Sequence, residues 1–251
     1  MNLELNGKTA LVTGAGSGIG QATALAFARE GAHLVLTDLK PDGLDHTAQL
    51  IRDANPDVRT LTVIADAGQA HDHKQAVQQA LTTFGRLDAA VNNAGMGGEN
   101  VPVADVNPAN WQRVIEVNLS GVFYGMQAQI PALLQSGGGS IVNVASILRQ
   151  AGWANGAAYV ASKHGVVGLT RTAALDYATK GLRVNAVGPG FIETPILGED
   201  RKALDHLASL HPIGRLGKPE EIASLIVFLS SPKASLITGA YYNADGGYLA
   251  R

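Results

Sequence analysis

Short runs of β-branched and apolar residues recur along the chain and are separated by helix-length segments. This alternation constrains the fold most, because strands that alternate with helices form a parallel sheet covered by helices. Near-continuous apolar strands fit burial on both faces, and right-handed crossovers then give the doubly wound order of a Rossmann-type sheet. We therefore expect an α/β protein with one such domain over residues 1–251. The runs span 9–13, 33–37, 60–65, 88–92, 140–146 and 183–187.

Composition narrows the possible functions. The 251 residues are 46% hydrophobic, enough for one large core, and no repeat or linker interrupts them. The formal charge of −2, with both signs mixed, gives no basic patch for nucleic acid. No cysteine is present, which excludes disulfides and thiolate chemistry, and we expect no metal.

The start of the chain, MNLELNGKTALV, does not have the pattern of a secretion signal. No apolar stretch of the sequence is long and charge-free enough to span a bilayer. We therefore expect a cytoplasmic protein without a membrane partner.

The segment 191–212 is the least regular part of the chain. It carries Pro195 and Gly198 before a short amphipathic stretch that ends at His211 and Pro212. It directly follows a predicted strand end, where ligands of open α/β sheets bind. We interpret it as a substrate flap, with an ordinary surface excursion as the alternative.

A glycine-rich turn, TGAGSGIG over 13–20, follows the first predicted strand and opens an apolar helix. Glycine suits such a turn because it adopts positive φ and lets the backbone approach a pyrophosphate closely. The N-terminus of the following helix can bind an anion. The glycines concerned are Gly14, Gly18 and Gly20. The spacing is G-x-x-x-G-x-G. The strand before it and the helix after it favour a dinucleotide site over a purely structural turn.

Asp38, at the end of the second predicted strand, points to the cofactor. It follows Gly18 at about the distance at which a carboxylate binds the adenosine ribose. A 2′-phosphate would meet like charge there, and neither Ser17 nor Leu39 supplies a cation. We therefore predict NAD rather than NADP, although the long Lys40 side chain could reach toward a phosphate.

Asp66 and the segment 92–95 (NNAG) end the third and fourth predicted strands. Each alone is more often a strand-end cap. Together with the glycine turn they indicate one long groove at a single edge of the sheet.

Tyr159 and Lys163 are four residues apart in YVASK, which opens an apolar helix, so they share one face. A phenol loses its proton near pH 10, and its use as an acid or base near neutrality requires a neighbouring cation. The alternative is a solvated helix face. Ser146, at the end of SIVNVAS, could donate to the same substrate oxygen as Tyr159. Asn118 could bend its helix or bind a relay water, although both residue types commonly cap turns.

These residues resemble the short-chain dehydrogenases/reductases with a T-G-x-x-x-G-I-G turn, over nearly the whole chain. The resemblance includes NNAG (92–95), YVASK (159–163), PG (189–190) and DGG (245–247). It implies a catalytic tetrad of Asn118, Ser146, Tyr159 and Lys163, with Tyr159 as acid/base, Ser146 positioning substrate, Lys163 lowering the Tyr159 pKa and Asn118 holding the water.

The resemblance also implies a cofactor site and a homotetramer. Asp66 is expected near adenine, Asn92 near its ribose and Thr194 near the nicotinamide amide. Ala67, where a larger aliphatic is usual, and Gly188 before Pro189 are departures from the family pattern. The expected cofactor residues are Gly14, Ser17, Gly18, Ile19, Gly20, Asp38, Leu39, Asp66, Ala67, Asn92, Ala94, Gly95, Tyr159, Lys163, Pro189, Gly190, Ile192 and Thr194.

Residues next to the catalytic strand ends predict a mostly apolar substrate pocket, although each of them could instead pack the core. They are Met96, Ile147, Leu148, Trp153, Phe191, Ile196 and Leu197. We predict NAD(H)-dependent interconversion of a small or medium secondary alcohol and its ketone, cyclic or aryl.

Three alternatives stay open. A 3-oxoacyl-(acyl-carrier-protein) reductase would need a basic docking face, for which Arg149, Arg201 and Lys202 are the candidates. A sugar dehydrogenase is the second. The third is a dinucleotide-binding redox sensor without turnover, against which the complete tetrad argues.

Overall fold

The protein is described here from a computed structural model that covers residues 2–250; the outermost residues of the predicted domain, Met1 and Arg251, lie outside the described residues. Strands and helices alternate through most of the chain. The strands are β1 (Thr9–Thr13), β2 (His33–Asp38), β3 (Thr60–Ile64), β4 (Ala89–Asn92), β5 (Gly139–Val144), β6 (Leu182–Pro189) and β7 (Tyr241–Ala244). The α-helices are α1 (Gly18–Arg29), α2 (Pro41–Ala54), α3 (Ala70–Phe84), α4 (Pro108–Ile115), α5 (Gly121–Gln135), α6 (Ala157–Tyr177), α7 (Arg201–Leu210) and α8 (Pro219–Ser230).

All seven strands form one sheet in the order β3-β2-β1-β4-β5-β6-β7. Every pairing is parallel, and β1 lies between β2 and β4, with Leu11 opposite both Val35 and Ala90. Chain order reverses between β1 and β4, which is where open sheets of this kind bind ligands beyond the carboxyl ends of their strands. The predicted Rossmann-type fold is confirmed.

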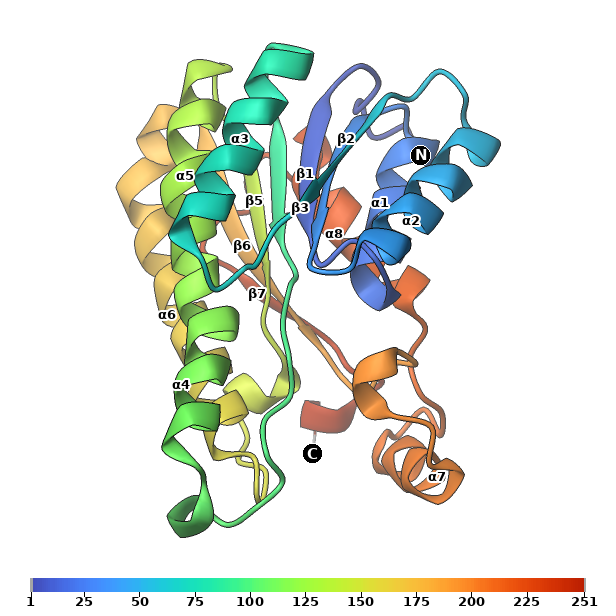
Figure 1. The fold of residues 1–251 in the computed structure, drawn as a ribbon, viewed down its shortest axis with the longest axis vertical. Helices are drawn as coiled ribbons and strands as arrows, with labels where there is room; N and C mark the ends of the chain where they lie inside the picture. Colours follow the sequence, from blue (N-terminus) through green and yellow to red (C-terminus); the bar gives the residue numbers. More distant parts are fainter. Residues whose placement is uncertain (1, 251) are drawn as a thin grey trace.

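Helices cover both faces of the sheet (Figure 1). Helices α3, α4, α5 and α6 lie on one side, and α1, α2 and α8 on the other. Each face has its own apolar core: Phe27, Leu36 and Ile226 belong to the α1 side, and Leu133 and Leu182 to the α5 side. Burial of strands on both faces explains their near-continuous apolar sequence.

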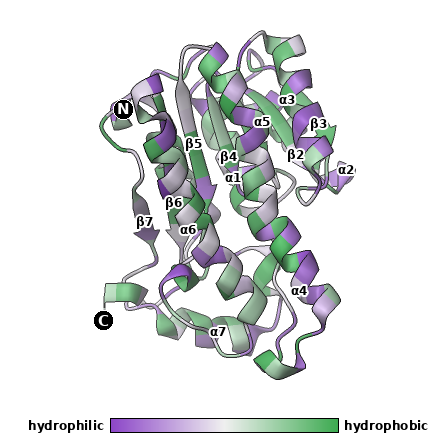
Figure 2. Cartoon of the chain, turned by 90° about the vertical axis from the view of Figure 1, so that its left-hand side faces the viewer, coloured by the Kyte–Doolittle hydropathy of each residue, from purple (hydrophilic) through white to green (hydrophobic). Residues whose placement is uncertain are grey.

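One strand escaped the sequence prediction. The six predicted strands are present, but β7 was missed because its sequence YYNA is neither apolar nor alternating. Figure 2 colours β7 toward the hydrophilic end, in contrast to the greener central strands. Its position comes from pairing with β6, from Ala186 opposite Tyr241 to Pro189 opposite Ala244.

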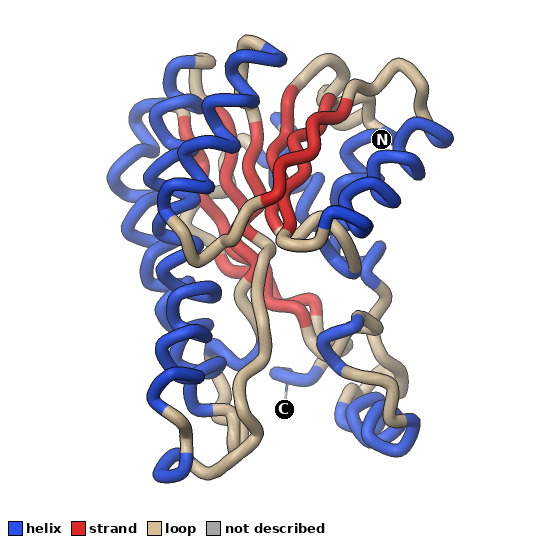
Figure 3. Tube along the Cα trace, viewed as in Figure 1, coloured by secondary structure: helices blue, strands red, loops and turns tan. Residues whose placement is uncertain are grey.

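The predicted flap, 191–212, folds beyond the carboxyl end of the sheet. It contains a short 3₁₀ turn, η5 (Pro195–Leu197), and the amphipathic helix α7, whose first turn is capped by Asp200 through the N–H of Lys202 at 3.0 Å. Figure 3 shows loops and short helices gathered in the same region below the strands. Among residues 2–250, no helix combines the length and the apolar character needed to cross a bilayer.

Candidate active site

A large cleft opens at the carboxyl ends of the central strands. Its volume is about 690 Å³, and residues that are far apart in the sequence surround it. Most of the predicted cofactor residues line it: Gly14, Ser17, Gly18, Ile19, Asp38, Ala94, Gly95, Tyr159, Lys163, Pro189, Gly190, Ile192 and Thr194. Lys40 and Asn93, which the sequence analysis placed near a phosphate and in the groove, also line the cleft. Glu99 and Asn155 line it too, and the sequence prediction did not include them.

The glycine turn has the backbone that its sequence predicts. Gly14 and Gly18 have φ of +65° and +53°, a region that L side chains rarely adopt. A Cβ on Gly20 would lie 2.0 Å from the carbonyl oxygen of Gly14, so this position permits no side chain. Gly20 does not line the cleft; it allows α1 to pack closely on the turn.

The first turn of α1 is available to an anion. Ser17, the residue before the helix, makes no side-chain capping hydrogen bond. The first N–H groups of a helix have no intrahelical acceptor and lie at the positive end of its dipole. Ser17, Gly18 and Ile19 all line the cleft, so this end of α1 fits a pyrophosphate.

Asp38 lies in the same cleft, at the end of β2. Its Oδ2 accepts a hydrogen bond from the Gly16 N–H at 3.0 Å, and its Oδ1 accepts one from the Lys40 N–H at 3.1 Å. Backbone bonds on both oxygens hold the carboxylate in place. Lys40, two residues after Asp38, also lines the cleft, so this part of the cleft contains a cation as well as the carboxylate.

Thr13 and Asn93 join the glycine turn to the NNAG segment. The Thr13 Oγ1 accepts hydrogen bonds from the N–H groups of Asn93 and Ala94, both at 3.0 Å. The Asn93 Nδ2 donates to the Thr13 carbonyl at 2.9 Å. These bonds keep β1 and β4 in register at the floor of the cleft, which sequence reasoning did not find because the partners are 80 positions apart.

The Asn92 side chain does not line the cleft, and the expected contact of this residue with the ribose stays a prediction. It is buried beneath the cleft, and its side-chain amide donates to Asn143 Oδ1 at 2.9 Å and accepts from Gln129 Nε2 at 2.8 Å. The Asn92 side chain is therefore committed to an interior network between β4, β5 and α5. Leu39 is exposed and does not line the cleft either.

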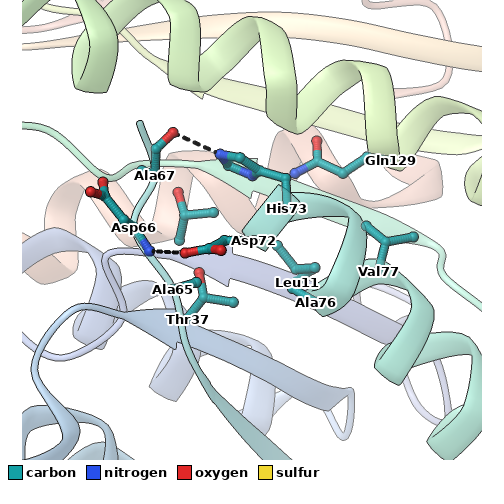
Figure 4. Close-up of a pocket in the computed structure, with 11 residues that line it drawn as sticks. Leu11, Thr37, Ala65, Asp66, Ala67, Asp72, His73, Ala76, Val77 and Gln129 are labelled. Carbon is teal, nitrogen blue, oxygen red and sulfur yellow. Dashed lines mark hydrogen bonds between the residues drawn. The ribbon is translucent and has the colours of Figure 1, made fainter. Parts of the chain in front are cut away.

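Asp66 and Ala67 line a separate small cavity of about 10 Å³, shown in Figure 4. The Asp66 N–H donates to Asp72 Oδ2 at 2.8 Å, and the His73 ring and Ala67 carbonyl oxygen are 2.9 Å apart. Burial lowers the pKa of His73, and its bond to Ala67 opposes this. A neutral imidazole with hydrogen on Nε2 therefore holds the β3–α3 loop through this carbonyl.

Arg113 binds the Asp66 side chain. Its Nη2 donates to the two carboxylate oxygens at 3.0 and 2.9 Å. This ion pair joins the end of β3 to α4. The adenine contact expected of Asp66 stays a prediction.

Tyr159 and Ser146 meet at the cleft. The Ser146 side chain is next to the Tyr159 phenol: burial raises the pKa of Tyr159, and Ser146 lowers it. The Ser146 Oγ also accepts from the Leu148 N–H at 3.1 Å, which caps the short turn η3 (Ile147–Arg149). The two predicted oxygen-binding groups are thus brought together.

Lys163 lies one helical turn from Tyr159, as its spacing predicts. Its Nζ is 5.5 Å from the centre of the Tyr159 ring and donates to the Val144 carbonyl at 2.9 Å. Burial lowers the pKa of Lys163 to about 8. The predicted lowering of the Tyr159 pKa by Lys163 stays a prediction, since burial and Ser146 are the causes of the shift in this state.

Asn118 sits in a π-helical turn, η2 (Glu116–Ser120), between α4 and α5. The helix is therefore irregular at Asn118, and the predicted bend stays a prediction. The Asn118 side chain is fully buried, donates to the Met96 carbonyl at 2.8 Å and accepts from the Met96 N–H at 2.9 Å. It fixes the backbone of Met96, which lines the cleft; the relay water stays a prediction.

Comparison with known proteins agrees with this arrangement. A family model described as enoyl-(acyl carrier protein) reductase matches residues 14–249. A cyclohexanol dehydrogenase from Acinetobacter sp. (strain SE19) is 45% identical over 251 residues, covering 100% of this chain and 98% of that protein. A 3-oxoacyl-(acyl-carrier-protein) reductase from Thermotoga maritima is 41% identical, covering 98% of this chain and 99% of that protein. The crystal structure of a levodione reductase has a TM-score of 0.95 at 36% identity, covering 98% of this chain and 99% of that one.

The chain belongs to the short-chain dehydrogenase/reductase family. It is an oxidoreductase of secondary alcohols and ketones.

Trp153 and Phe191 line the cleft of this dehydrogenase, and the aromatic cluster continues behind Phe191. Phe191 lies 5.5 Å from Trp153, 5.4 Å from His211 and 5.6 Å from Tyr248, measured between ring centres. His211 is held on both ring nitrogens, by the Arg215 carbonyl at 2.7 Å and the Phe191 N–H at 3.1 Å. Sequence reasoning missed His211 and Tyr248 because no motif marks them.

Most of the predicted substrate residues reach the cleft. Met96, Leu148, Trp153, Phe191, Ile196 and Leu197 line it. Ile147 does not: it is 1% exposed and packs in the apolar cluster beneath Phe191 and Leu148. In the part of the chain that the structure covers, no group of His, Asp and Glu is arranged to hold a metal ion.

Proposed function

We propose that this dehydrogenase interconverts a cyclic, largely apolar secondary alcohol and its ketone with NAD(H), and that Tyr159 is the acid/base. The observation that carries the proposal is that Tyr159 lines the cleft with Ser146 beside it and Lys163 one helical turn away. The two hydroxyl groups are placed to hold one substrate oxygen from two sides.

The cleft suits a nicotinamide dinucleotide. Gly14 and Gly18 leave room for a pyrophosphate at the start of α1, and Thr194 approaches that turn closely, since a Cβ on Gly18 would lie 3.0 Å from its Cγ2. The Asp38 carboxylate favours a free ribose and repels a 2′-phosphate, which supports NAD over NADP. When bound, the nicotinamide supplies the hydride acceptor for the alcohol carbon, and in its reduced form the donor.

The side chains of the tetrad carry out the proton transfer. During oxidation the Tyr159 oxygen takes the hydroxyl proton of the alcohol, and during reduction it returns a proton to the ketone oxygen. The Ser146 hydroxyl donates to the same oxygen. The Lys163 ammonium stabilises the phenolate form of Tyr159, and its bond to Val144 fixes its position.

The substrate class follows from the cleft walls. Leu148, Trp153, Phe191 and Leu197 offer apolar and aromatic surface next to Tyr159. A hydrocarbon ring buries well against such surface, whereas these four side chains offer few hydrogen-bond partners to the hydroxyl groups of a sugar. The relatives named as cyclohexanol dehydrogenase and cis-4-hydroxycyclohexanecarboxylate dehydrogenase support this choice.

The test measures NADH formation by the purified protein with cyclohexanol, a larger cyclic alcohol, an aryl alcohol and a sugar, each with NAD and with NADP. We expect turnover of the cyclic alcohols with NAD. Tyr159→Phe is expected to lose about 10²- to 10⁴-fold in kcat, the range for a general acid/base, while still binding NADH. Tyr124→Phe, on α5 outside the cleft, is the matched control. Unchanged turnover in Tyr159→Phe, or turnover of the sugar alone, would contradict the proposal.

A second candidate is reduction of a 3-oxoacyl thioester on a carrier protein, favoured by the Thermotoga maritima relative. Such a reductase would need a basic face to bind the carrier protein, and two of the three candidate cations already have partners within this chain. Arg201 pairs with Asp205 at 3.3 Å, and the Arg149 guanidinium covers the Tyr241 ring at 3.7 Å. A short 3-oxoacyl thioester with NADH and NADPH, run beside cyclohexanone, decides between the two: faster thioester reduction with NADPH would favour this second candidate.

We also propose a homotetramer, which rests on the resemblance to a family whose members are commonly tetramers. Light scattering behind size exclusion tests it, and a mass corresponding to one chain would contradict it.

A further inference from the structure

Tyr241 reaches across one strand of the sheet to another. It lies on β7, and its hydroxyl donates a 2.8 Å hydrogen bond to the carbonyl oxygen of Ser146, which follows β5. The strand between them, β6, carries Gly188 at the crossing point. A Cβ at Gly188 would lie 1.6 Å from the Tyr241 hydroxyl oxygen, so only glycine leaves this path open. Gly188, which departs from the family pattern, therefore leaves the space that the Tyr241 ring occupies.

The Ser146 carbonyl is bound a second time. It also accepts from the Arg149 N–H at 3.1 Å. The Arg149 guanidinium lies 3.7 Å from the centre of the Tyr241 ring, so the same residue contacts both the acceptor and the donor. Burial raises the pKa of Tyr241, and the neighbouring Arg149 opposes this. Because a carbonyl oxygen can only accept, the bond to Ser146 requires the protonated phenol.

The backbone on the other side of Ser146 is anchored as well. The Ala145 N–H donates to Val187 at 2.8 Å, and the Val144 carbonyl receives the Lys163 ammonium at 2.9 Å. Beyond Ser146 the sheet ends and the chain turns into η3. The hydrogen bond from Tyr241 therefore holds the backbone of Ser146 itself, and this backbone determines where the Ser146 hydroxyl lies relative to Tyr159.

We propose that Tyr241 is a positioning residue for catalysis, which holds the Ser146 backbone so that the Ser146 hydroxyl is aligned on the substrate oxygen. This inference rests on the proposed function, in which Ser146 binds that oxygen. Misplacing a reacting group by a fraction of an ångström to an ångström is costly, because the alignment of reacting atoms supplies much of an enzyme's rate.

The test compares Tyr241→Phe with Tyr242→Phe in the full-length protein. Tyr242 is the next residue on the same strand and packs against the opposite core. We expect Tyr241→Phe to lower kcat for cyclohexanol oxidation about 10-fold with little change in NADH affinity. Tyr242→Phe is expected to leave kcat unchanged. Melting temperatures of both variants verify that they fold.

The pH profile separates positioning from a general structural effect. Ser146 lowers the pKa of Tyr159, so loosening Ser146 should raise the apparent pKa of the kcat/KM profile in Tyr241→Phe and not in Tyr242→Phe. The titratable and charged groups that influence Tyr241 are Arg149, Asp245 and Tyr159. An unshifted profile together with an unchanged kcat would overturn the inference.

A double-mutant cycle with Ser146→Ala tests the route of the effect. If Tyr241 acts through the Ser146 hydroxyl, Tyr241→Phe has no further effect once that hydroxyl is absent. Equal losses in both backgrounds would refute the inference while leaving the proposed function intact. Full activity of Ser146→Ala alone would instead refute the role of Ser146 in the proposed function.

Discussion

The cofactor side and the substrate side of the cleft are built differently. The cofactor side, from β1 to β4, is made mainly of backbone: glycines with positive φ, a helix N-terminus, and a carboxylate held by two N–H groups. The predicted substrate side is made of side chains: Trp153 and Phe191 line the cleft, and the rings of His211 and Tyr248 pack against Phe191. At Gly14, Gly18 and Gly20 an added Cβ is strained or clashes, whereas the side chains of the other wall can be exchanged without moving the backbone. The two sides should therefore respond differently to substitution.

Among the substitutions that compare the two sides, Gly20→Ala on the cofactor side is expected to have the largest effect. Its Cβ would lie 2.0 Å from the Gly14 carbonyl oxygen, so the turn must move. We expect NADH affinity to fall by roughly 100-fold, in line with an overpacking cost of about 1–3 kcal/mol. Gly97→Ala is the control, because Gly97 also lines the cleft but has open space around its Cβ position. Fluorescence titration with NADH measures both; equal affinity of the two variants would break the contrast drawn above.

Asp38→Ala is expected to change the choice of cofactor. Removing a carboxylate that faces a 2′-phosphate should shift the ratio of kcat/KM for NAD over NADP by about 10- to 100-fold, with most of the change in NADP. Asp42→Ala, which removes an exposed charge from the first turn of α2, is the control. Initial rates with each cofactor at saturating alcohol measure the ratio. An unchanged KM for NADP would count against the role of Asp38.

Trp153→Ala is expected to affect the substrate side of the cleft and to leave cofactor binding unchanged. The Trp153 ring covers Phe191, and losing an aromatic pair worth about 0.5–1.5 kcal/mol should raise the KM for cyclohexanol up to about 10-fold without changing the KM for NAD. Trp111→Ala is a close control, since Trp111 is 39% exposed and Trp153 is 37% exposed, but Trp111 lies on α4 outside the cleft. A rise in the KM for NAD with Trp153→Ala would show that the two sides are not separable.

The smallest effect is expected from Arg113→Ala. Its ion pair with Asp66 joins the β3 end to α4, and both side chains are partly exposed. Such pairs contribute about 0–1 kcal/mol, so we expect a small drop in melting temperature and a KM for NAD within about 3-fold of the wild type. Thermal unfolding and NAD kinetics test this. A larger rise in KM would place Asp66 closer to the cofactor than its pairing with Arg113 suggests.

The sequence predicted most of the sheet and the cofactor side because both follow from local rules. Apolar runs between helices specify parallel strands, and the glycine spacing specifies the turn that Gly14, Gly18 and Gly20 form. The strand β7 was missed since Tyr241 and Tyr242 owe their strand conformation to pairing with β6. Propensity is a weak guide where tertiary contacts decide.

The candidate site was predicted less evenly. Tyr159 and Lys163 are one helical turn apart, so their meeting could be read from spacing. Asn92 was expected at the cofactor but bonds to Gln129 and Asn143, partners that spacing does not reveal. A strand-end residue can point to either face of the sheet, and only the packing around it decides which.

The pairing of Gly188 with Tyr241 limits how parts of this enzyme can be exchanged with those of relatives. Grafting a segment with a bulkier residue at 188 onto this β7 would force the Tyr241 ring aside, while a smaller residue at 241 would leave a hollow over Gly188. Chimeras should therefore inherit positions 188 and 241 from the same parent.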